Sequence, residues 1–248
     1  MFRFFRTTRQ QLLNENKTVK YLKYAVGEVL LIVAGILVAL QINNWNEGRK
    51  LEQDRRELIE DLKVDYQTNL ELWESVKNDT EIQLDVFNQL LKVTASENQE
   101  LSVLEIKGLA ENTQKYYGFQ PSLGVYESAK STDSIGLIED DSLKGLFVRF
   151  QTTHWLLNNL YVQQGTDFWT GSALRMREKL GSIHVLFDRE DFRPERFELS
   201  VEEYRKFIAQ KDVYAFWENR QRQVIYQLRL YEVMKETTEQ ILATLEAL

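Results

Sequence analysis

The chain has 248 residues, a formal net charge of −7 and no cysteine. The missing cysteines exclude disulfides, thiolate nucleophiles and cysteine metal sites. Two prolines and eleven glycines are few for this length, which favours long helices over a turn-rich β-fold.

Residues 1–23 form a short basic segment. Six lysines and arginines and the single acid Glu15 give a net +5 before Ala25, so the whole-chain charge of −7 leaves −12 on residues 25–248. We expect residues 2–23 to form a cytoplasmic or interfacial helix whose phenylalanines dip into lipid while its arginines face phosphates. The acidic remainder argues against a nucleic-acid partner.

The stretch Tyr24–Ile42, YAVGEVLLIVAGILVALQI, is the most apolar part of the chain. Nineteen helical residues cover about 28 Å, close to the roughly 30 Å of a bilayer core. Tyr24 and Trp45 stand at its two ends, where aromatic rings favour the headgroup level. We predict a transmembrane helix over residues 24–42. A cleaved signal peptide and a buried helix of a soluble domain are the competing interpretations, although the exit lacks an A-x-A cleavage pattern.

The charge asymmetry also predicts an orientation. Basic flanks of a span stay in the cytoplasm. We therefore expect a bacterial inner-membrane protein with a cytoplasmic N-terminus and a periplasmic domain over residues 43–248, with the lipid bilayer as a partner.

Several residues in or beside the span are candidates for a membrane or oligomer interface. Small residues let helices approach closely, and polar residues mark the membrane boundary. Glu28 would act as a proton or cation site or as a polar lock between helices, or it would reach the headgroups and pair with Lys20 or Lys23. The candidates are Gly27, Glu28, Gly35, Ala39, Asn43, Asn44 and Trp45. Gly27 is expected to lie on much the same face as Gly35 and Ala39.

Three sequence blocks, FFRTTRQQLLNENK, YLKYAVGE and GILVALQINNWNE, lead to a family resemblance over residues 2–47. They resemble the opening of an uncharacterised family of bacterial single-span membrane proteins, abundant in Bacteroidota. The segment Tyr126–Leu146 is similar to a second block of that family, but it carries Thr132-Asp133-Ser134 in place of a shorter Ser-Gly turn. The resemblance implies a topology and no activity.

After the span the apolar residues recur at helical spacing nearly to the end of the chain. We expect an all-α fold: one transmembrane helix followed by a helical bundle, in which the long helices at both ends of the domain pack antiparallel. We expect a helix over 51–91 that can be continuous with the span, a break in it at Asn78-Asp79-Thr80, and a loop over 94–98. Helices over 102–113 and 123–130 and a polar turn over 131–136 should follow. The rest of the chain should form a helix from a cap at Asp140 or Asp141 to Val162, interrupted at Gly165 and resumed over 168–180; irregular chain over 181–198; and helices over 202–210, capped by Ser200, and 212–248.

The residue types that carry catalysis or bind metals are sparse. His154 reads as a core histidine, and His184 has Asp188 and Glu190 nearby in irregular chain. Serines 128, 131 and 134 lie near Lys130 but outside any nucleophile motif. The acids at 133 and 139–141 lack calcium-loop spacing. The aromatic residues of 148–169 and 214–231 suit a helix core, with a sugar or lipid groove as the alternative.

These observations favour a protein that is not an enzyme and uses no cofactor or metal. We expect a scaffold or interaction subunit that binds itself or another membrane protein. One alternative is a homo-oligomeric channel or proton-conducting subunit lined by Glu28, Gln41, Asn43 and Asn44. A periplasmic sensor or enzyme with a ligand pocket is the other.

Overall fold

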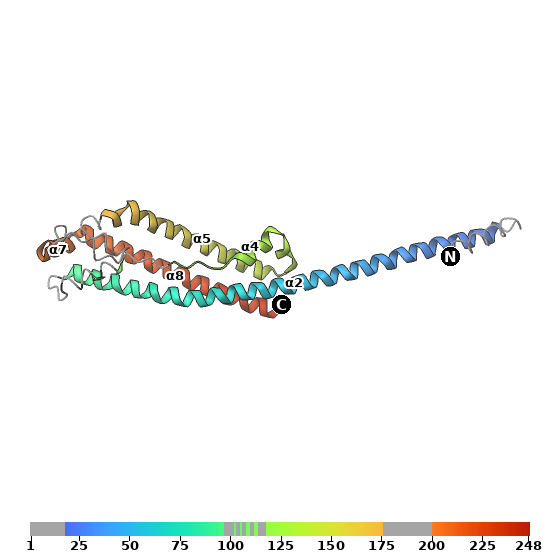
Figure 1. Cartoon of the computed structure of the whole chain (residues 1–248), viewed down its shortest axis with the longest axis horizontal. Helices are drawn as coiled ribbons and strands as arrows, with labels where there is room; N and C mark the ends of the chain where they lie inside the picture. The colour runs from blue at the N-terminus through green and yellow to red at the C-terminus, as the bar shows by residue number, and fades with distance from the viewer. Residues whose placement is uncertain are drawn as a thin grey trace, which may run out of the picture. The chain divides into compact units, whose positions relative to one another are not determined.

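The structure is a computed structural model that describes residues 18–96, positions 102, 105, 108, 109, 112 and 113, and residues 118–175 and 200–248. Its elements are α2 (Thr18–Ala95), α4 (Gly124–Ser131), the 3-10 helix η1 (Ser134–Leu137), α5 (Asp141–Thr170), α7 (Val201–Ile208) and α8 (Lys211–Ala247) (Figure 1). These ranges contain no strand, so the all-α prediction is confirmed. The predicted interfacial helix up to residue 17 and the predicted irregular chain over 181–198 lie outside the described residues.

The chain divides into two compact units, Met1–Leu58 and Ile59–Leu248. Helix α2 is continuous from Thr18 to Ala95, so the predicted span and the helix predicted after it are one helix. The boundaries expected after residues 23 and 42 therefore fall inside a single helix. The break predicted at Asn78-Asp79-Thr80 is wrong. The Thr80 hydroxyl donates to the carbonyl of Val76 at 2.7 Å, which satisfies this buried side chain without ending the helix.

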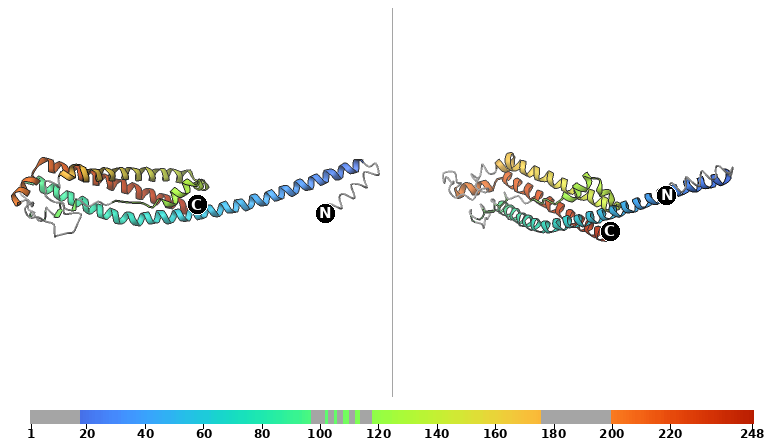
Figure 2. Two further views of the ribbon diagram at one scale, coloured as in Figure 1. Left: turned by 45° about the horizontal axis from the view of Figure 1, so that its top comes forward. Right: turned by 45° about the vertical axis from the view of Figure 1, so that its right-hand side comes forward.

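The second unit contains the hydrophobic core. In α2 the core-facing side chains follow a three- to four-residue spacing, and in α8 they do the same, so each helix has one buried stripe. Two views of the ribbon show α5 and α8 running alongside each other (Figure 2). The largest fully buried side chains are Tyr66, Tyr231, Phe87, Phe119, Phe150, Leu62, Leu90, Ile138, Leu143, Leu157 and Ile208.

Side-chain hydrogen bonds give the direction of the long helices. The indole nitrogen of Trp73 donates to the carbonyl of Tyr231 at 2.9 Å, and Gln221 donates to Asn88 further along α2. Residue numbers along α2 therefore increase in the direction in which residue numbers along α8 decrease. The predicted antiparallel pairing of the two terminal helices is confirmed.

The helix ends match the sequence prediction at two caps. Asp140 accepts the backbone N–H of Leu143 at 2.7 Å and begins α5, while Ser200 forms the predicted capping box with Glu203. The interruption expected at Gly165 is wrong, because α5 runs through it to Thr170.

Helix α5 ends at Thr170, and after a bend at Gly171 residues 172–175 are helical again. The helix predicted over 168–180 is therefore confirmed as far as Arg175, with an interruption at Gly171. The last turn of α5 is closed by Asp167, whose Oδ1 accepts the backbone N–H of Ser172 at 2.8 Å and the hydroxyl of Ser172 at 2.6 Å. Residues 176–180 lie outside the described residues.

Candidate functional site

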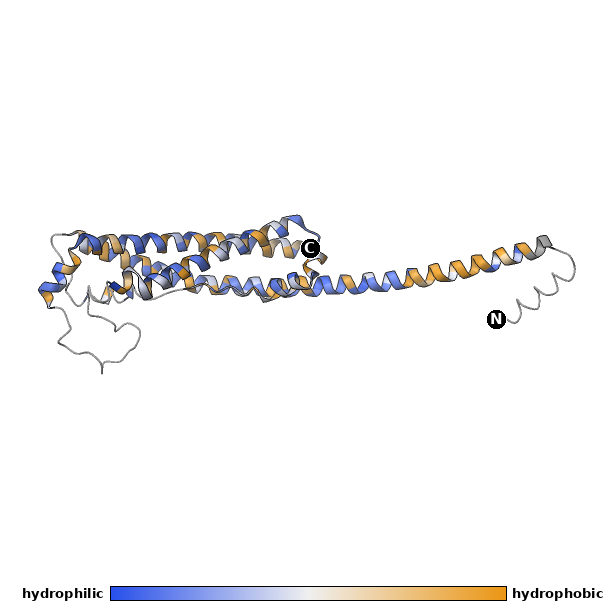
Figure 3. Cartoon of the chain, turned by 90° about the horizontal axis from the view of Figure 1, so that it is seen from above, coloured by the Kyte–Doolittle hydropathy of each residue, from blue (hydrophilic) through white to orange (hydrophobic). Residues whose placement is uncertain are grey.

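The N-terminal part of α2 has an apolar surface that nothing in the described chain covers. Every residue from Val29 to Leu40 is exposed, and the run stands out as a continuous hydrophobic band in Figure 3. A helix that is apolar on all sides needs an apolar surrounding, because water solvates such a surface poorly. Within the described residues, α2 is the one helix long and apolar enough to cross a membrane.

Three of the candidate interface residues lie on one line along this helix. At about 100° per residue, Gly35 and Ala39 fall within about 20° of Glu28 on either side. An added Cβ at Gly35 would meet nothing within 4 Å, so a neighbouring helix has room to approach there. The helix therefore brings a carboxylate and two small residues to one face.

The other candidates are turned away from that line. Gly27 lies about 80° from Gly35, so the expectation that it shares this face is corrected by the helix geometry. Asn44 lies about 160° from Glu28, so the two cannot line one narrow path on the same helix face. Asn43 is about 60° away.

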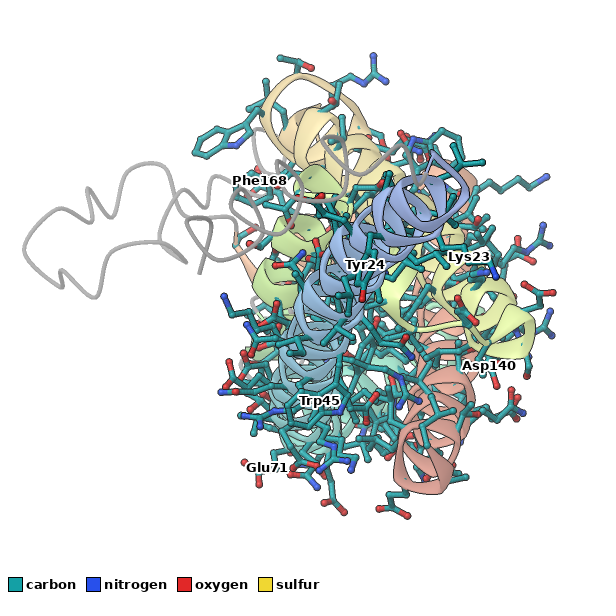
Figure 4. The ribbon with its side chains drawn as sticks, turned by 90° about the vertical axis from the view of Figure 1, so that its right-hand side faces the viewer. Lys23, Tyr24, Trp45, Glu71, Asp140 and Phe168 are labelled. Carbon is teal, nitrogen blue, oxygen red and sulfur yellow. The ribbon has the colours of Figure 1, made fainter. Side chains whose placement is uncertain are left out.

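The two aromatic residues at the ends of the apolar run are exposed. Tyr24 and Trp45 are labelled with Lys23 along α2 in Figure 4. The guanidinium of Arg49 lies 5.2 Å from the centre of the Trp45 ring, one turn further on. A cation beside an indole fits the headgroup level of a bilayer.

Histidine chemistry in the second unit, within the described residues, is confined to His154. Its Nε2 lies 3.1 Å from the side-chain amide of Asn158, and burial lowers the pKa of the imidazole. His184, Asp188 and Glu190 lie outside the described residues. Among the residues that the structure does describe, no three His, Asp or Glu side chains gather as metal ligands.

The serine cluster at the C-terminal end of α4 makes local hydrogen bonds. The hydroxyl of Ser131 donates to the carbonyl of Ser128 at 2.8 Å, and that of Ser134 donates to the carbonyl of Ala129 at 3.3 Å. Of the nearby acids, Asp140 caps α5, and Asp141 pairs with Lys144 at 3.0 Å. These hydroxyls and carboxylates close helix ends.

A polar clasp that the sequence analysis missed joins α2 to the chain before α4. The two carboxylate oxygens of Asp65 accept the hydroxyl of Ser122 at 2.9 Å and the backbone N–H of Val125 at 3.1 Å. One turn later, the side chain of Asn69 exchanges two hydrogen bonds with the backbone of Ser122. Asp65 thereby satisfies the N-terminus of α4, which lacks a cap of its own.

A buried polar chain, also missed, crosses the centre of the bundle. The hydroxyls of Tyr161 and Tyr231 lie 2.8 Å apart, Gln227 donates to Tyr231 at 2.7 Å, and Gln164 donates to Gln227 at 3.2 Å. Burial raises the pKa of both tyrosines above the ordinary value. Both therefore keep their protons near neutral pH and serve as hydrogen-bonding groups.

An open groove of about 340 Å³ lies on the surface between α5 and α8. Its one charged residue, Arg222, is paired with Glu218 at 2.7 Å, and His154 does not line it. The lining residues are Leu156, Asn159, Leu160, Gln163, Arg222, Gln223 and Tyr226. This set offers apolar contact and amides but no acid or nucleophile.

The aromatic residues of α5 divide between two faces. Phe150 and Phe168 are buried, as a core assignment predicts, whereas Trp155 and Trp169 are exposed. Assigning all of them to the core is therefore wrong for the two tryptophans. Their spacing of fourteen residues, with a valine midway, was the signal in the sequence that could have separated them.

The model of DUF6090, a family of unknown function, matches residues 28–163. That range includes the GILVALQINNWNE block and the segment Tyr126–Leu146, and it excludes the first 27 residues. No curated protein and no solved structure matches the chain significantly.

Proposed function

The chain belongs to the DUF6090 family of unknown function, and for it we propose the role of a single-span membrane scaffold. In this proposal residues 24–42 cross the bilayer, and the helical domain that follows binds a second copy or another membrane protein. The exposed apolar surface of Val29–Leu40 carries the proposal. Transfer of this surface from water into lipid is favourable in proportion to its apolar area.

The proposed orientation rests on charge. A net +5 before the span and −12 on residues 25–248 favour a cytoplasmic N-terminus and a periplasmic domain in a bacterial inner membrane. A labelling test is straightforward in a chain without cysteines. Single cysteines at Thr18 and Ser102 should react with an impermeant maleimide from the cytoplasmic and periplasmic sides, respectively. Periplasmic labelling at position 18 would reverse the topology.

The line of Glu28, Gly35 and Ala39 supports association through the span. Close approach at Gly35 and Ala39 increases van der Waals contact, which drives helix pairing in lipid. A carboxylate at the depth of Glu28 is costly when it faces acyl chains. Both terms favour turning this face toward another helix.

The mass of the full-length protein in detergent or nanodiscs, from light scattering, tests the scaffold role. We expect a mass above the 29.3 kDa monomer. Gly35→Leu should weaken assembly, whereas Val33→Leu, on the opposite face about 160° away, should not. A monomer in the bilayer that also retrieves no partner after crosslinking would end the proposal, as would a mature chain beginning near Asn43.

A conducting subunit is the second candidate, and the position of Glu28 on the small-residue face favours it. If this face meets a symmetry axis, the Glu28 carboxylates of several copies converge there. Their mutual repulsion then strongly disfavours the state in which all of them are ionised. Proton flux into vesicles that contain the full chain tests this role. A proton flux that Glu28→Gln abolishes would support conduction. Vesicles that contain the parent protein and stay impermeable to protons would exclude a conducting role.

A further inference from the structure

Helix α5 carries a row of large apolar side chains that point away from the core. Val148, Trp155, Val162 and Trp169 follow one another at intervals of seven and are 63%, 63%, 67% and 64% exposed. A seven-residue repeat keeps its line along a neighbouring helix when the two helices wind around each other in a left-handed supercoil. The row therefore has the period of a coiled-coil contact.

A second exposed row runs beside the first. Each member lies three residues before a member of the apolar row, which is the relation of a to d positions in a heptad. This row is Gly145, Thr152, Asn159 and Thr166. An added Cβ at Gly145 would meet nothing within 4 Å, so no contact inside the described chain requires a glycine there. We call the eight residues of both rows the α5 seam.

Charge indicates what kind of surface the seam fits. From Phe150 to Thr166 the helix has seventeen residues without Asp, Glu, Lys or Arg, in a chain that is 28% charged. Lys144 and Arg149, at the N-terminal end of the seam, are paired with Asp141 and Glu236 at 3.0 and 3.7 Å. A surface that meets its own copy must avoid a net charge, because each charge would face the same sign. The neutrality of the seam thus favours a second copy of this chain over a charged partner.

We propose that the α5 seam pairs with the α5 seam of a second copy, parallel and in register. A parallel arrangement places a positions opposite a positions, so Asn159 meets the Asn159 of the second copy, and amides paired in this way specify register. An antiparallel arrangement would set that amide against apolar d positions. The pairing deepens the proposed scaffold function and rests on it.

The exposed area is compatible with a stable contact. A tryptophan side chain carries on the order of 200 Å². Trp155 and Trp169, nearly two thirds exposed, therefore each leave on the order of 130 Å² in water. Across two copies the four rings supply on the order of 500 Å², about a third of a standard interface of roughly 1,600 Å². The valines, the threonines and the adjoining groove beside Asn159 extend the contact surface.

Oxidative crosslinking of the full-length protein in vesicles tests the pairing, since the chain has no native cysteine. Val148→Cys and Val162→Cys should each form a disulfide-linked dimer. Val64→Cys is the matched control, because this valine is 61% exposed on α2 in the same unit. Crosslinking of both seam variants at no more than the Val64→Cys level would overturn the proposal. Crosslinking at position 162 without position 148 would overturn the parallel register.

A second measurement separates this inference from the scaffold function. Trp155→Glu with Trp169→Glu should reduce the Val162→Cys dimer at least tenfold while helical content by circular dichroism stays constant, since both rings are exposed. A chain that remains oligomeric by light scattering but does not crosslink at the seam retains the scaffold role and loses this interface. Quenching by brominated lipid that is lost when Trp155 and Trp169 are both replaced by Glu, or crosslinks from position 162 to a different protein, would assign the seam to another partner and overturn the inference.

Discussion

The hydroxyl oxygens of Tyr161 and Tyr231 lie 2.8 Å apart across the α5–α8 interface. Tyr161 also accepts the backbone N–H of Phe119 at 2.9 Å, and Gln227 donates to Tyr231 at 2.7 Å. The pair thus connects two long helices with the segment that precedes α4. Because both residues are bulky, and Tyr231 is fully buried, a lost partner leaves polar atoms away from water.

Replacement of Tyr231 by Phe should therefore lower the free energy of unfolding by about 1–3 kcal/mol, because Gln227 and Tyr161 each lose a partner. Tyr161→Phe should have a similar effect by leaving the N–H of Phe119 unpaired. The double variant should cost less than the sum, since both substitutions remove the same hydroxyl–hydroxyl bond. Urea unfolding of the full chain in detergent measures all three. Strictly additive losses would contradict the coupling.

The clasp at Asp65 gives a second prediction. Asp65→Asn keeps one acceptor oxygen where two are used, so either Ser122 or the N–H of Val125 faces an amide donor. We expect a loss of about 1–2 kcal/mol and faster amide exchange at Val125. Asp61→Asn, one turn earlier and exposed, is the matched control and should be nearly neutral. Unchanged exchange at Val125 would show that the clasp does not hold α4.

Two glycines near the end of α5 should respond in opposite directions to alanine. A Cβ at Gly171 would lie 2.5 Å from Oδ1 and 2.7 Å from the Cα of Asp167, and a backbone atom cannot move aside without displacing the helix. At Gly165 the same Cβ would meet nothing within 4 Å. Gly171→Ala should therefore destabilise the fold, while Gly165→Ala should stabilise it by up to about 1 kcal/mol through helix propensity. Thermal melting that moves both variants the same way would contradict this explanation.

Local patterns explain which parts of the fold the sequence predicts. Trp217, Val224 and Tyr231 repeat at helical spacing, and all three are buried in α8. Asp140 and Ser200 are recognisable as caps because a cap depends on neighbours within three residues. Elements of this kind need no knowledge of the tertiary structure.

The failures come from contacts that depend on distant segments. Asn78-Asp79-Thr80 has the residue types of a helix break, but packing buries Thr80 and keeps α2 continuous. Asp65 and Ser122 are 57 residues apart, so no local sequence pattern predicts their hydrogen bond. The candidate interface is different, because the rotation of about 100° per helical residue is enough to align Glu28 with Gly35 and to turn Gly27 away.

His154 makes the stability of the bundle depend on pH. Burial lowers its pKa below the ordinary 6.5, so between these two values the unfolded chain binds more protons than the folded one. Stability is therefore complete above about pH 6.5 and declines as the pH falls below it. Melting temperatures at pH 7.5 and 5.5 should differ more for the parent than for His154→Gln, with His184→Gln as the control. An equal change in melting temperature between the two pH values for the parent and for His154→Gln would show that His154 does not cause the pH dependence.

Trp73 gives the last prediction, because two lysines and a backbone carbonyl converge on its indole. The ammonium groups of Lys77 and Lys235 lie 4.9 and 4.7 Å from the ring centre, and the indole N–H donates to the carbonyl of Tyr231. Trp73→Phe keeps an aromatic ring but loses this donor and weakens both cation contacts, so we expect a loss of about 2 kcal/mol.

Substitutions of the two lysines separate the cation–π contribution to this loss of stability from that of the indole hydrogen bond. Lys235→Met combined with Trp73→Phe should show a coupling of about 0.5–1 kcal/mol, the size of an exposed cation–π contact. Lys77→Met should cost more than Lys235→Met in the parent, because Lys77 also pairs with Glu232 at 3.1 Å. Urea unfolding of the single and double variants gives these values. If the coupling energy between Lys235 and Trp73 is zero, Lys235 makes no cation–π contribution, and the indole hydrogen bond and the ring volume account for the stabilisation by Trp73.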